Sequence, residues 1–327
     1  MTTTWPPQPD GPGRSAGGTG LAHGVLHCNI NTGDVSAAHD FYAGLLGLNR
    51  RMRSQSSDAD GTALGIEGTT DTDAWFLYDW RGPRVAAALE LVQWNDPALA
   101  DRPPPEPWRT GLSALGYYVP DVSVVERRLR EPAPPGSAHP GTVRSGALPH
   151  RGASTHGLRV TDLDGVTVEL VEAPHPYDPA PGATLSHLRI NCSDLGDSLA
   201  WYTALGFTPL VARSRVTLPG DVAGVEGEIE VSLASLALPR DRSFTLELVQ
   251  WHRPTGTGTP PQAANSQGLY RIALASEHVT ARQGAEPVWI PMAGTPLGGL
   301  TVLFLKDPDG VVVELVERPA SALARRD

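Results

Sequence analysis

Histidine and glutamate residues recur at matching places in the two halves of this 327-residue sequence. The recurring residues are His27, Glu90 and Glu169 in the first half and His187, Glu247 and Glu314 in the second half. Each glutamate stands among aliphatic residues, where an unpaired carboxylate is costly to bury. It should therefore meet a metal ion, a cation or a hydrogen-bonding network. Imidazole and carboxylate groups that face one cavity suit a divalent ion such as Zn, Ni, Mn or Fe.

Each of these residues also has a simpler interpretation. A histidine on a strand is usually a packed or surface residue, and the glutamates could be salt-bridged residues of a cavity without a metal. The recurrence of His27 at His187, with glutamates at matching places, favours a shared site. His139, His150 and His156 fall in a long loop and are interpreted as incidental, although one of them could reach the site as a ligand.

The strands that carry the two histidines have one apolar and one polar face. Side chains alternate along a strand, so His27 and Asn29 of segment 26–31 point to the same side. The corresponding segment of the second half places His187 and Arg189 together in the same way. The apolar face should pack on a helix, and the face with the histidines should line a polar site.

An internal repeat in the sequence indicates which strands and helices position these residues. LELVQW at 89–94 returns at 246–251, and GVTVELVE at 165–172 returns as GVVVELVE at 310–317. Each half divides further into two units with the order strand, helix and several strands. The predicted elements of the first half are strands at 25–31, 74–79, 86–94, 113–119, 157–161 and 166–172, with helices from Asp34 to 46–47 and over 121–130.

The length suits two domains of roughly 150 residues. A Pro/Gly-rich loop is expected at 131–157, and APHPYDPAPGA is expected to be a linker because of its proline content. The expected division is a disordered N-terminal tail at 1–21, a first domain at 22–172, the linker at 173–183, a second domain at 184–319 and a C-terminal tail at 320–327.

The composition argues against several classes of protein. No run of about 18 apolar residues could span a bilayer, and the first residues lack the pattern of a signal peptide, so we expect a cytoplasmic protein. A net charge of -10 argues against binding to nucleic acid or an anionic membrane. Two cysteines, Cys28 and Cys192, are too few for a disulfide framework. The expected partner is a small molecule, and the chain is expected to be a monomer or homodimer.

These motifs resemble the vicinal-oxygen-chelate superfamily, which includes glyoxalase I, bleomycin resistance proteins and extradiol dioxygenases. The most specific pieces are His27 with the following FYAGLLGL segment, the LELVQW strands and the DLDG and DPDG turns before the closing Glu-Leu pairs. The resemblance covers 22–172 and 184–317 and is closest to glyoxalase I. It implies an α+β fold of two tandem domains, each made of paired βαβββ modules whose curved mixed sheet cups a central cavity.

The resemblance also implies metal ligands. It assigns His27, Glu90 and Glu169 to one site, with Ala114 where the family has a second histidine. Ala114 and Gly116 share a face and leave space, so a three-ligand site with open positions is feasible. The other cavity positions are Asn29, Tyr118 and Arg189.

The second implied set contains an arginine. It consists of His187, Glu247 and Glu314, with Arg271 in place of the histidine, and the fixed charge of Arg271 predicts a site without metal. If the modules pair across the two halves, Arg271 instead joins His27 and Glu90. The competent set is then His187, Glu247, Ala114 and Glu169, and the sequence leaves this pairing open.

Three functions follow from the resemblance. The first is a metal-dependent isomerase, epimerase or lyase that chelates neighbouring substrate oxygens while Glu169 or Glu90 moves the proton. The second is a metal-free binding or antibiotic-resistance protein of the bleomycin-resistance kind. Its cavity would be lined by Trp94, Trp251, Tyr118 or Tyr202. The third, an extradiol dioxygenase, needs two histidines and a glutamate around iron, which Ala114 and Arg271 put in doubt.

Overall fold

The computed structural model describes residues 21–101, 106–131, 141–173, 182–292 and 294–324, which form four modules. Module 1 consists of β1 (Gly24–Thr32), α1 (Val35–Leu46), β2 (Asn49–Asp60), η1 (Thr62–Leu64), β3 (Thr69–Tyr78) and β4 (Ala88–Asp96). Module 2 consists of β5 (Gly111–Val119), α2 (Val122–Arg130), β6 (Val143–His150), β7 (Ala153–Thr161) and β8 (Thr167–Glu172).

Modules 3 and 4 repeat the pattern with small changes. Module 3 consists of β9 (Thr184–Asn191), α3 (Leu195–Leu205), β10 (Thr208–Pro219), η2 (Asp221–Ala223), β11 (Glu228–Leu238) and β12 (Asp241–Arg253). Module 4 consists of β13 (Gly268–Ser276), β14 (Val288–Met292), β15 (Gly298–Lys306) and β16 (Val312–Glu317), and its described residues include no helix between β13 and β14.

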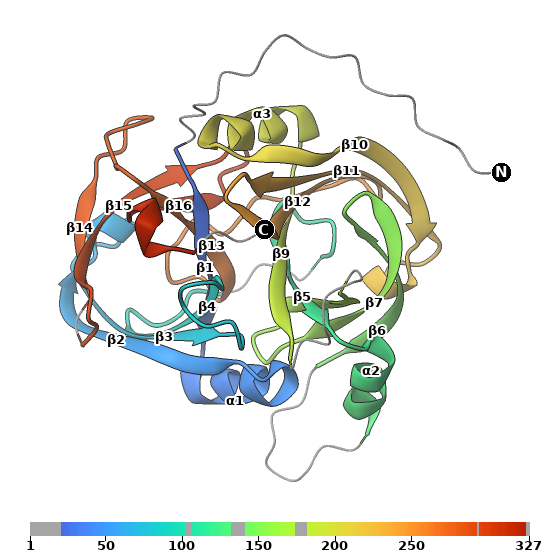
Figure 1. Cartoon of the computed structure of the whole chain (residues 1–327), viewed down its shortest axis with the longest axis horizontal. Helices are drawn as coiled ribbons and strands as arrows, with labels where there is room; N and C mark the ends of the chain where they lie inside the picture. Colours follow the sequence, from blue (N-terminus) through green and yellow to red (C-terminus); the bar gives the residue numbers. More distant parts are fainter. Residues whose placement is uncertain (1–20, 102–105, 132–140, 174–181, 293, 325–327) are drawn as a thin grey trace.

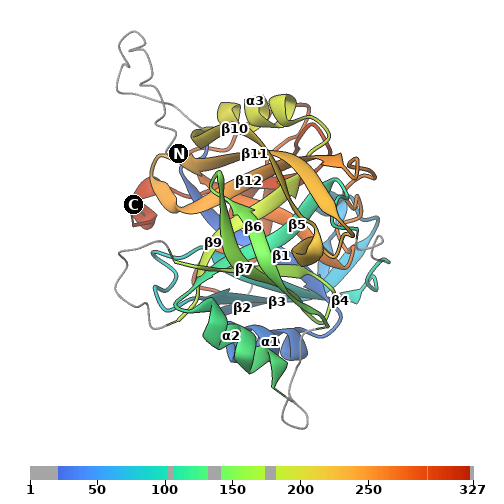
Figure 2. The ribbon, with the colours of Figure 1, turned by 90° about the vertical axis from the view of Figure 1, so that its right-hand side faces the viewer.

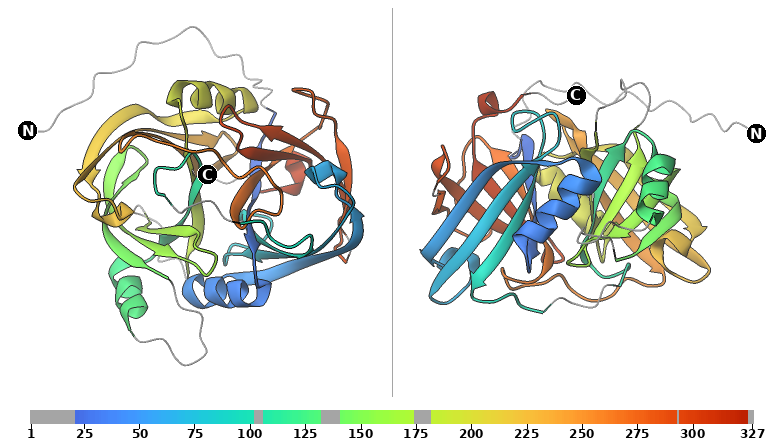
Figure 3. Two further views of the ribbon diagram at one scale, coloured as in Figure 1. Left: turned by 180° about the vertical axis from the view of Figure 1, so that it is seen from behind. Right: turned by 90° about the horizontal axis from the view of Figure 1, so that it is seen from below.

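The modules combine into two eight-stranded sheets, each drawn from both halves of the sequence. Sheet I has the order β14-β15-β16-β13-β1-β4-β3-β2, and sheet II has the order β10-β11-β12-β9-β5-β8-β7-β6. Module 1 therefore pairs with module 4, and module 2 pairs with module 3. Both sheets curl, and they lie side by side with β1 and β9 near the middle of the molecule (Figure 1, Figure 3).

This pairing decides a question that the sequence leaves open. The first strand of every module is one of the two edges of its group of strands, and its unpaired N–H and C=O groups favour pairing with another edge. β1 meets β13 in antiparallel register, and β5 meets β9 in the same way. The division at 22–172 and 184–319 consequently follows the sequence repeat but does not separate the two sheets.

The main hydrophobic core lies between the sheets and under the helices. Cys28 and Ile30 of β1 and Leu188 and Ile190 of β9 are buried in one cluster, to which α1 and α3 also contribute. Figure 2 shows sheet II with α3 at one end and with α1 and α2 at the other. The opposite face of β1 and β9, which carries the histidines, is turned into the hollow of each sheet.

Local sequence signals explain the helices. The Asp34 carboxylate accepts hydrogen bonds from the N–H groups of Ser36 and Ala37, which caps α1. Gly47 follows α1 with φ of 69°, a left-handed conformation that favours glycine. Every helix of the described residues is too short or too polar to cross a bilayer.

The DLDG and DPDG turns join modules of the same half. Tyr42 of α1 donates a hydrogen bond to Asp162 in the turn of module 2, at 2.8 Å. Tyr202 of α3 does the same with Asp307 in the turn of module 4, at 3.1 Å. Sheets thus connect modules of different halves, whereas helix-to-turn contacts connect modules within a half.

Some predicted segments need correction. The strands β2 and β10 are absent from the prediction because their exposed faces are polar, which hides the apolar alternation. The loop expected at 131–157 contains β6 and the start of β7. In the C-terminal tail expected at 320–327, Ala320–Ala322 forms a turn and Leu323 is buried. The N-terminal tail apart from Leu21, most of the linker and His139 lie outside the described residues.

We expect Tyr42→Phe and Tyr202→Phe each to lower the free energy of unfolding by about 1–2 kcal/mol, because a buried carboxylate loses a hydrogen bond. Urea denaturation measures this loss. Tyr117→Phe is the matched control, since among the described residues the fully buried Tyr117 hydroxyl has no hydrogen-bond partner. A loss of equal size in the control would show that the turn contacts contribute nothing specific.

Candidate functional site

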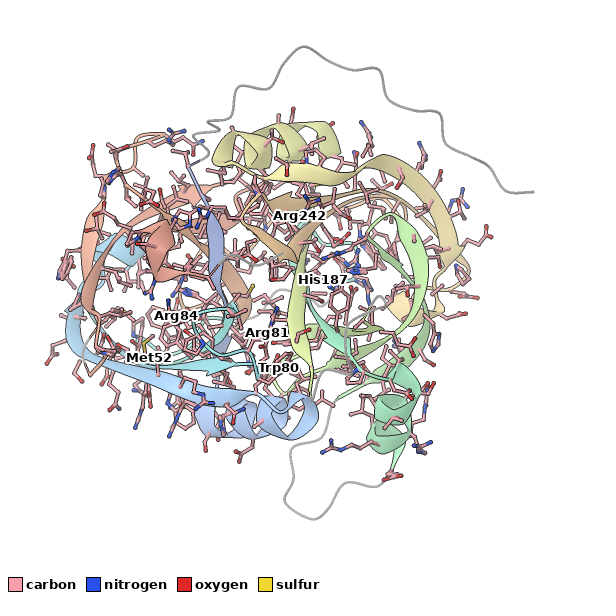
Figure 4. The ribbon with its side chains drawn as sticks, in the orientation of Figure 1. Met52, Trp80, Arg81, Arg84, His187 and Arg242 are labelled. Carbon is pink, nitrogen blue, oxygen red and sulfur yellow. The ribbon has the colours of Figure 1, made fainter. Side chains whose placement is uncertain are left out.

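Sheet I encloses a cavity of about 1040 Å³. Its walls are mainly apolar and include Met52, Phe76, Trp94, Trp289 and Phe304. Figure 4 shows Met52 in this sheet and His187 in the other. Cavities of this size hold drug-sized molecules, and a few polar groups usually orient the ligand.

The polar groups of the cavity come from four adjacent strands. His27 lies on β1, Glu90 on β4, Arg271 on β13 and Glu314 on β16. Arg271 donates from Nε to Glu314 Oε2 and from Nη2 to Glu90 Oε2, both at 2.8 Å. His27 Nε2 lies 3.3 Å from Glu90 Oε2 and 3.5 Å from Glu314 Oε2. We call these four residues the floor of the cavity.

The charges of the floor support one another. Burial opposes ionisation of Glu314, but Arg271 and His27 lower the pKa of this carboxyl group to about 2. Burial also works against the guanidinium, yet Glu90 and Glu314 raise the pKa of Arg271. Close opposite charges in a buried position account for both directions.

Sheet II has its own ion cluster at the corresponding place. Glu169 of β8 is fully buried and accepts hydrogen bonds from Arg159 at 2.6 and 2.8 Å and from Arg189 at 2.8 and 3.1 Å. His187 Nε2 lies 3.1 Å from Glu169 Oε2. Burial alone would raise the pKa of Glu169, but the two arginines and His187 hold it well below its ordinary value.

The second glutamate of sheet II accepts hydrogen bonds from hydroxyl groups and a backbone N–H group. Ser235 donates to Glu247 at 2.8 Å, and His150 Nδ1 lies 3.5 Å from the same carboxylate. His150 Nε2 is 2.9 Å from the Tyr118 hydroxyl. His150 was interpreted as incidental, and its position in β6 could not be recognised because the sequence around it indicates a loop.

Side-chain size explains why the hollow of sheet II is filled. Leu233 pairs with Val249 as Ala74 pairs with Val92 in sheet I, so a leucine takes the place of an alanine. Val222 of η2 packs with Leu148, Tyr118 and Val171 and closes the other side. The space expected beside Ala114 and Gly116 is also taken, because a Cβ atom on Gly116 would lie 1.8 Å from the His187 ring.

The residues present do not fit a metal ion in either sheet. Zinc needs oxygen and nitrogen ligands at about 2.0–2.2 Å with free lone pairs. In sheet I the Arg271 guanidinium lies between the two glutamates, and in sheet II Arg159 and Arg189 surround Glu169. Among the described residues, no group of three histidine, cysteine or carboxylate side chains is arranged to hold a metal ion. Arginine supplies the positive charge in both places.

Several predicted groupings are therefore corrected. Cross-pairing separates Glu169 from His27 and Glu90, which join Arg271 and Glu314 instead. His187, Glu247, Ala114 and Glu169 do share sheet II, but arginine groups occupy the space that was expected to be open. Of the four aromatic residues expected to line a cavity, only Trp94 lines the cavity of sheet I. Trp251 and Tyr118 are buried in the clusters of sheet II, and Tyr202 of α3 is buried in the main core.

Arg271→His should convert the floor into a metal site, because His27, Glu90 and Glu314 would gain a fourth ligand in place of the blocking cation. We expect purified variant to carry about one divalent ion per chain by elemental analysis after incubation with zinc. Ala114→His is the matched control, since Arg159 and Arg189 still surround Glu169 there. Equal zinc uptake by the two variants would contradict the blocking role of Arg271.

His150 should make the protein sensitive to acid. Burial, with His187, Arg151 and Arg189, lowers the pKa of His150 to about 2, whereas an unfolded chain protonates this histidine near pH 6.5. The unfolded state therefore binds the extra proton between these values, and stability falls as the pH falls below 6.5.

We expect His150→Phe to reduce the stability lost between pH 7.5 and pH 5 by about 1–2 kcal/mol relative to the unmodified protein. Urea denaturation at both pH values measures the difference. The comparison between variants cancels other groups, such as Asp307, whose pKa burial raises to about 6. His156→Phe, at an exposed position, should leave the pH dependence unchanged, and an equal effect there would contradict the prediction.

Comparison with solved structures shows the same arrangement of modules elsewhere. Glyoxalase I from Zea mays superposes with a TM-score of 0.61 at 19% sequence identity, and the match covers 90% of this chain and 92% of the maize chain. A single-substitution variant of the maize enzyme gives the same score and identity. A Bacillus subtilis protein provisionally described as a dioxygenase matches with a TM-score of 0.55 at 12% identity, over 94% of this chain and 89% of that chain.

No family profile and no curated protein matches the sequence. The structural matches span nearly the whole of both chains, which agrees with the resemblance inferred from the repeated motifs. The chain therefore has the fold of glyoxalase I, with four modules in one polypeptide.

Proposed function

We propose that this protein binds a largely apolar small molecule in the cavity of sheet I without a metal ion. One observation carries the proposal. On the concave face of sheet II, larger side chains and an ion network pack against one another, whereas sheet I encloses about 1040 Å³. An open apolar cavity is costly for stability unless a ligand or solvent fills it.

The charge at the floor favours binding over metal-assisted catalysis. A metal-dependent isomerase, epimerase or lyase requires an ion that polarises neighbouring substrate oxygens. Arg271 takes the position between Glu90 and Glu314 that such an ion would need. An extradiol dioxygenase has the same requirement. The binding or resistance type of protein therefore receives the greater support.

The aromatic residues of the cavity suit an amphipathic ligand. Trp94 and Phe76 form the inner wall, and Trp289 lies near the mouth, where it is 65% exposed. Aromatic side chains provide large contact areas at a small entropy cost. The bound molecule would place its apolar body against these rings and its polar end at the floor.

The uncharged dye N-phenylnaphthylamine provides a direct test, because its fluorescence rises in apolar surroundings. We expect it to bind the unmodified protein and to bind Ala74→Trp at least about tenfold more weakly, since the indole would occupy the cavity. Val124→Trp adds the same side chain at an exposed position of α2 and is the control. Equal affinity in all three proteins would mean that the cavity of sheet I is not the binding site.

A further inference from the structure

The floor of the cavity holds two carboxylates against a single arginine. Arg271 and His27 both approach the Oε2 atoms of Glu90 and Glu314. The printed contacts of both glutamates with Arg271 and His27 use the Oε2 atoms, and both glutamates line the cavity. Besides His27, the ionic side chains of the floor are two carboxylates and a single guanidinium.

The charges elsewhere in the cavity do not cancel this excess. The remaining charged residues of the described lining are Arg51, Arg318, Asp60 and Glu286. They comprise two cations and two anions, so the net charge of the lining arises at the floor. A charge in an apolar enclosure acts more strongly than one at the surface, because little water screens it.

Asn29, beside the floor in the sheet, has a side-chain amide without a hydrogen-bond partner among the described residues. Asn29 is fully buried, and both its Oδ1 and Nδ2 atoms lack hydrogen-bond partners among the described residues. In the strand register, Asn29 lies opposite Glu90 of β4 on one side and Arg271 of β13 on the other, so the three side chains share one face of the sheet. An unpaired buried amide costs free energy that a bound group would recover.

An anionic end group would fit this floor poorly. The Nε and Nη2 donors of Arg271 are already bonded to the glutamates, so an incoming carboxylate would face two like charges. A protonated amine, in contrast, has three donors. It could donate to the carboxylates of Glu90 and Glu314, both of which line the cavity. The aromatic wall would favour the same charge through cation–π contact.

We infer that the ligand carries a cationic nitrogen, such as a protonated amine, at one end of an apolar body, and that Glu90 and Glu314 receive this nitrogen. The inference rests on the proposed binding function of the cavity and adds the chemical class of the ligand. It assigns Arg271 as the residue that fixes the two carboxylates, with Asn29 beside them in the sheet.

Three probes with one alkyl chain and different end groups test the charge. Decylamine, decanol and decanoate are each used to displace N-phenylnaphthylamine from the unmodified protein at pH 7.5 and low salt. We expect decylamine to displace the dye at a concentration at least about tenfold lower than decanol, with decanoate the weakest. Equal displacement by all three, or strongest displacement by decanoate, would overturn the inference while leaving the binding function intact. Failure of the dye itself to bind would instead contradict the binding function.

Two neighbouring variants separate a role in charge recognition from a role in folding. Glu314→Gln removes a negative charge and should reduce the preference for decylamine over decanol by about tenfold. Arg271→Gln removes the positive charge and should increase the same preference. A merely structural role would weaken the binding of all three probes to a similar extent.

Glu286→Gln removes an exposed acidic group of the cavity lining and is the control for overall charge. An effect there as large as that of Glu314→Gln would place the recognition outside the floor.

Discussion

The neutralisation of buried glutamates by arginine is the constraint on which both hollows depend. A carboxylate on the concave face of a sheet is too costly to bury unless a positive group or several hydrogen-bond donors stand against it. Sheet I solves this with Arg271 between Glu90 and Glu314, and sheet II solves it with Arg159 and Arg189 around Glu169. The arginines come from different positions of the repeat, so the same requirement is met in two ways.

The cross-pairing of modules gives each sheet its particular set of residues. Because β1 pairs with β13, the arginine of module 4 reaches the histidine of module 1. Because β5 pairs with β9, the small residues Ala114 and Gly116 face His187 and Arg189, which take up the space beside them. The helix-to-turn contacts then bind the two sheets into one body across a shared core. The two sheets therefore share one pattern of strand pairing, but the side chains on their concave faces differ.

The difference between the hollows has a simple origin in side-chain volume. Ala74 in sheet I stands where Leu233 stands in sheet II, and Val222 closes sheet II against β6. A few methyl groups at such positions determine whether the interior is close-packed or can hold a ligand. The concave face of sheet II is closely packed, whereas the polar groups of sheet I line an accessible cavity. This division of roles underlies the proposal that a single cavity binds the ligand.

The sequence by itself determined the repeat, the module order and the face on which His27, Glu90 and their counterparts lie, because strand alternation and turn motifs are local properties. It could not determine the partner of each module, since all four free edges offer the same hydrogen-bonding groups. It also missed β2, β10 and the position of His150. Only the tertiary structure decided which arginine meets which glutamate and which hollow stays open, because these depend on side chains brought together from distant parts of the chain.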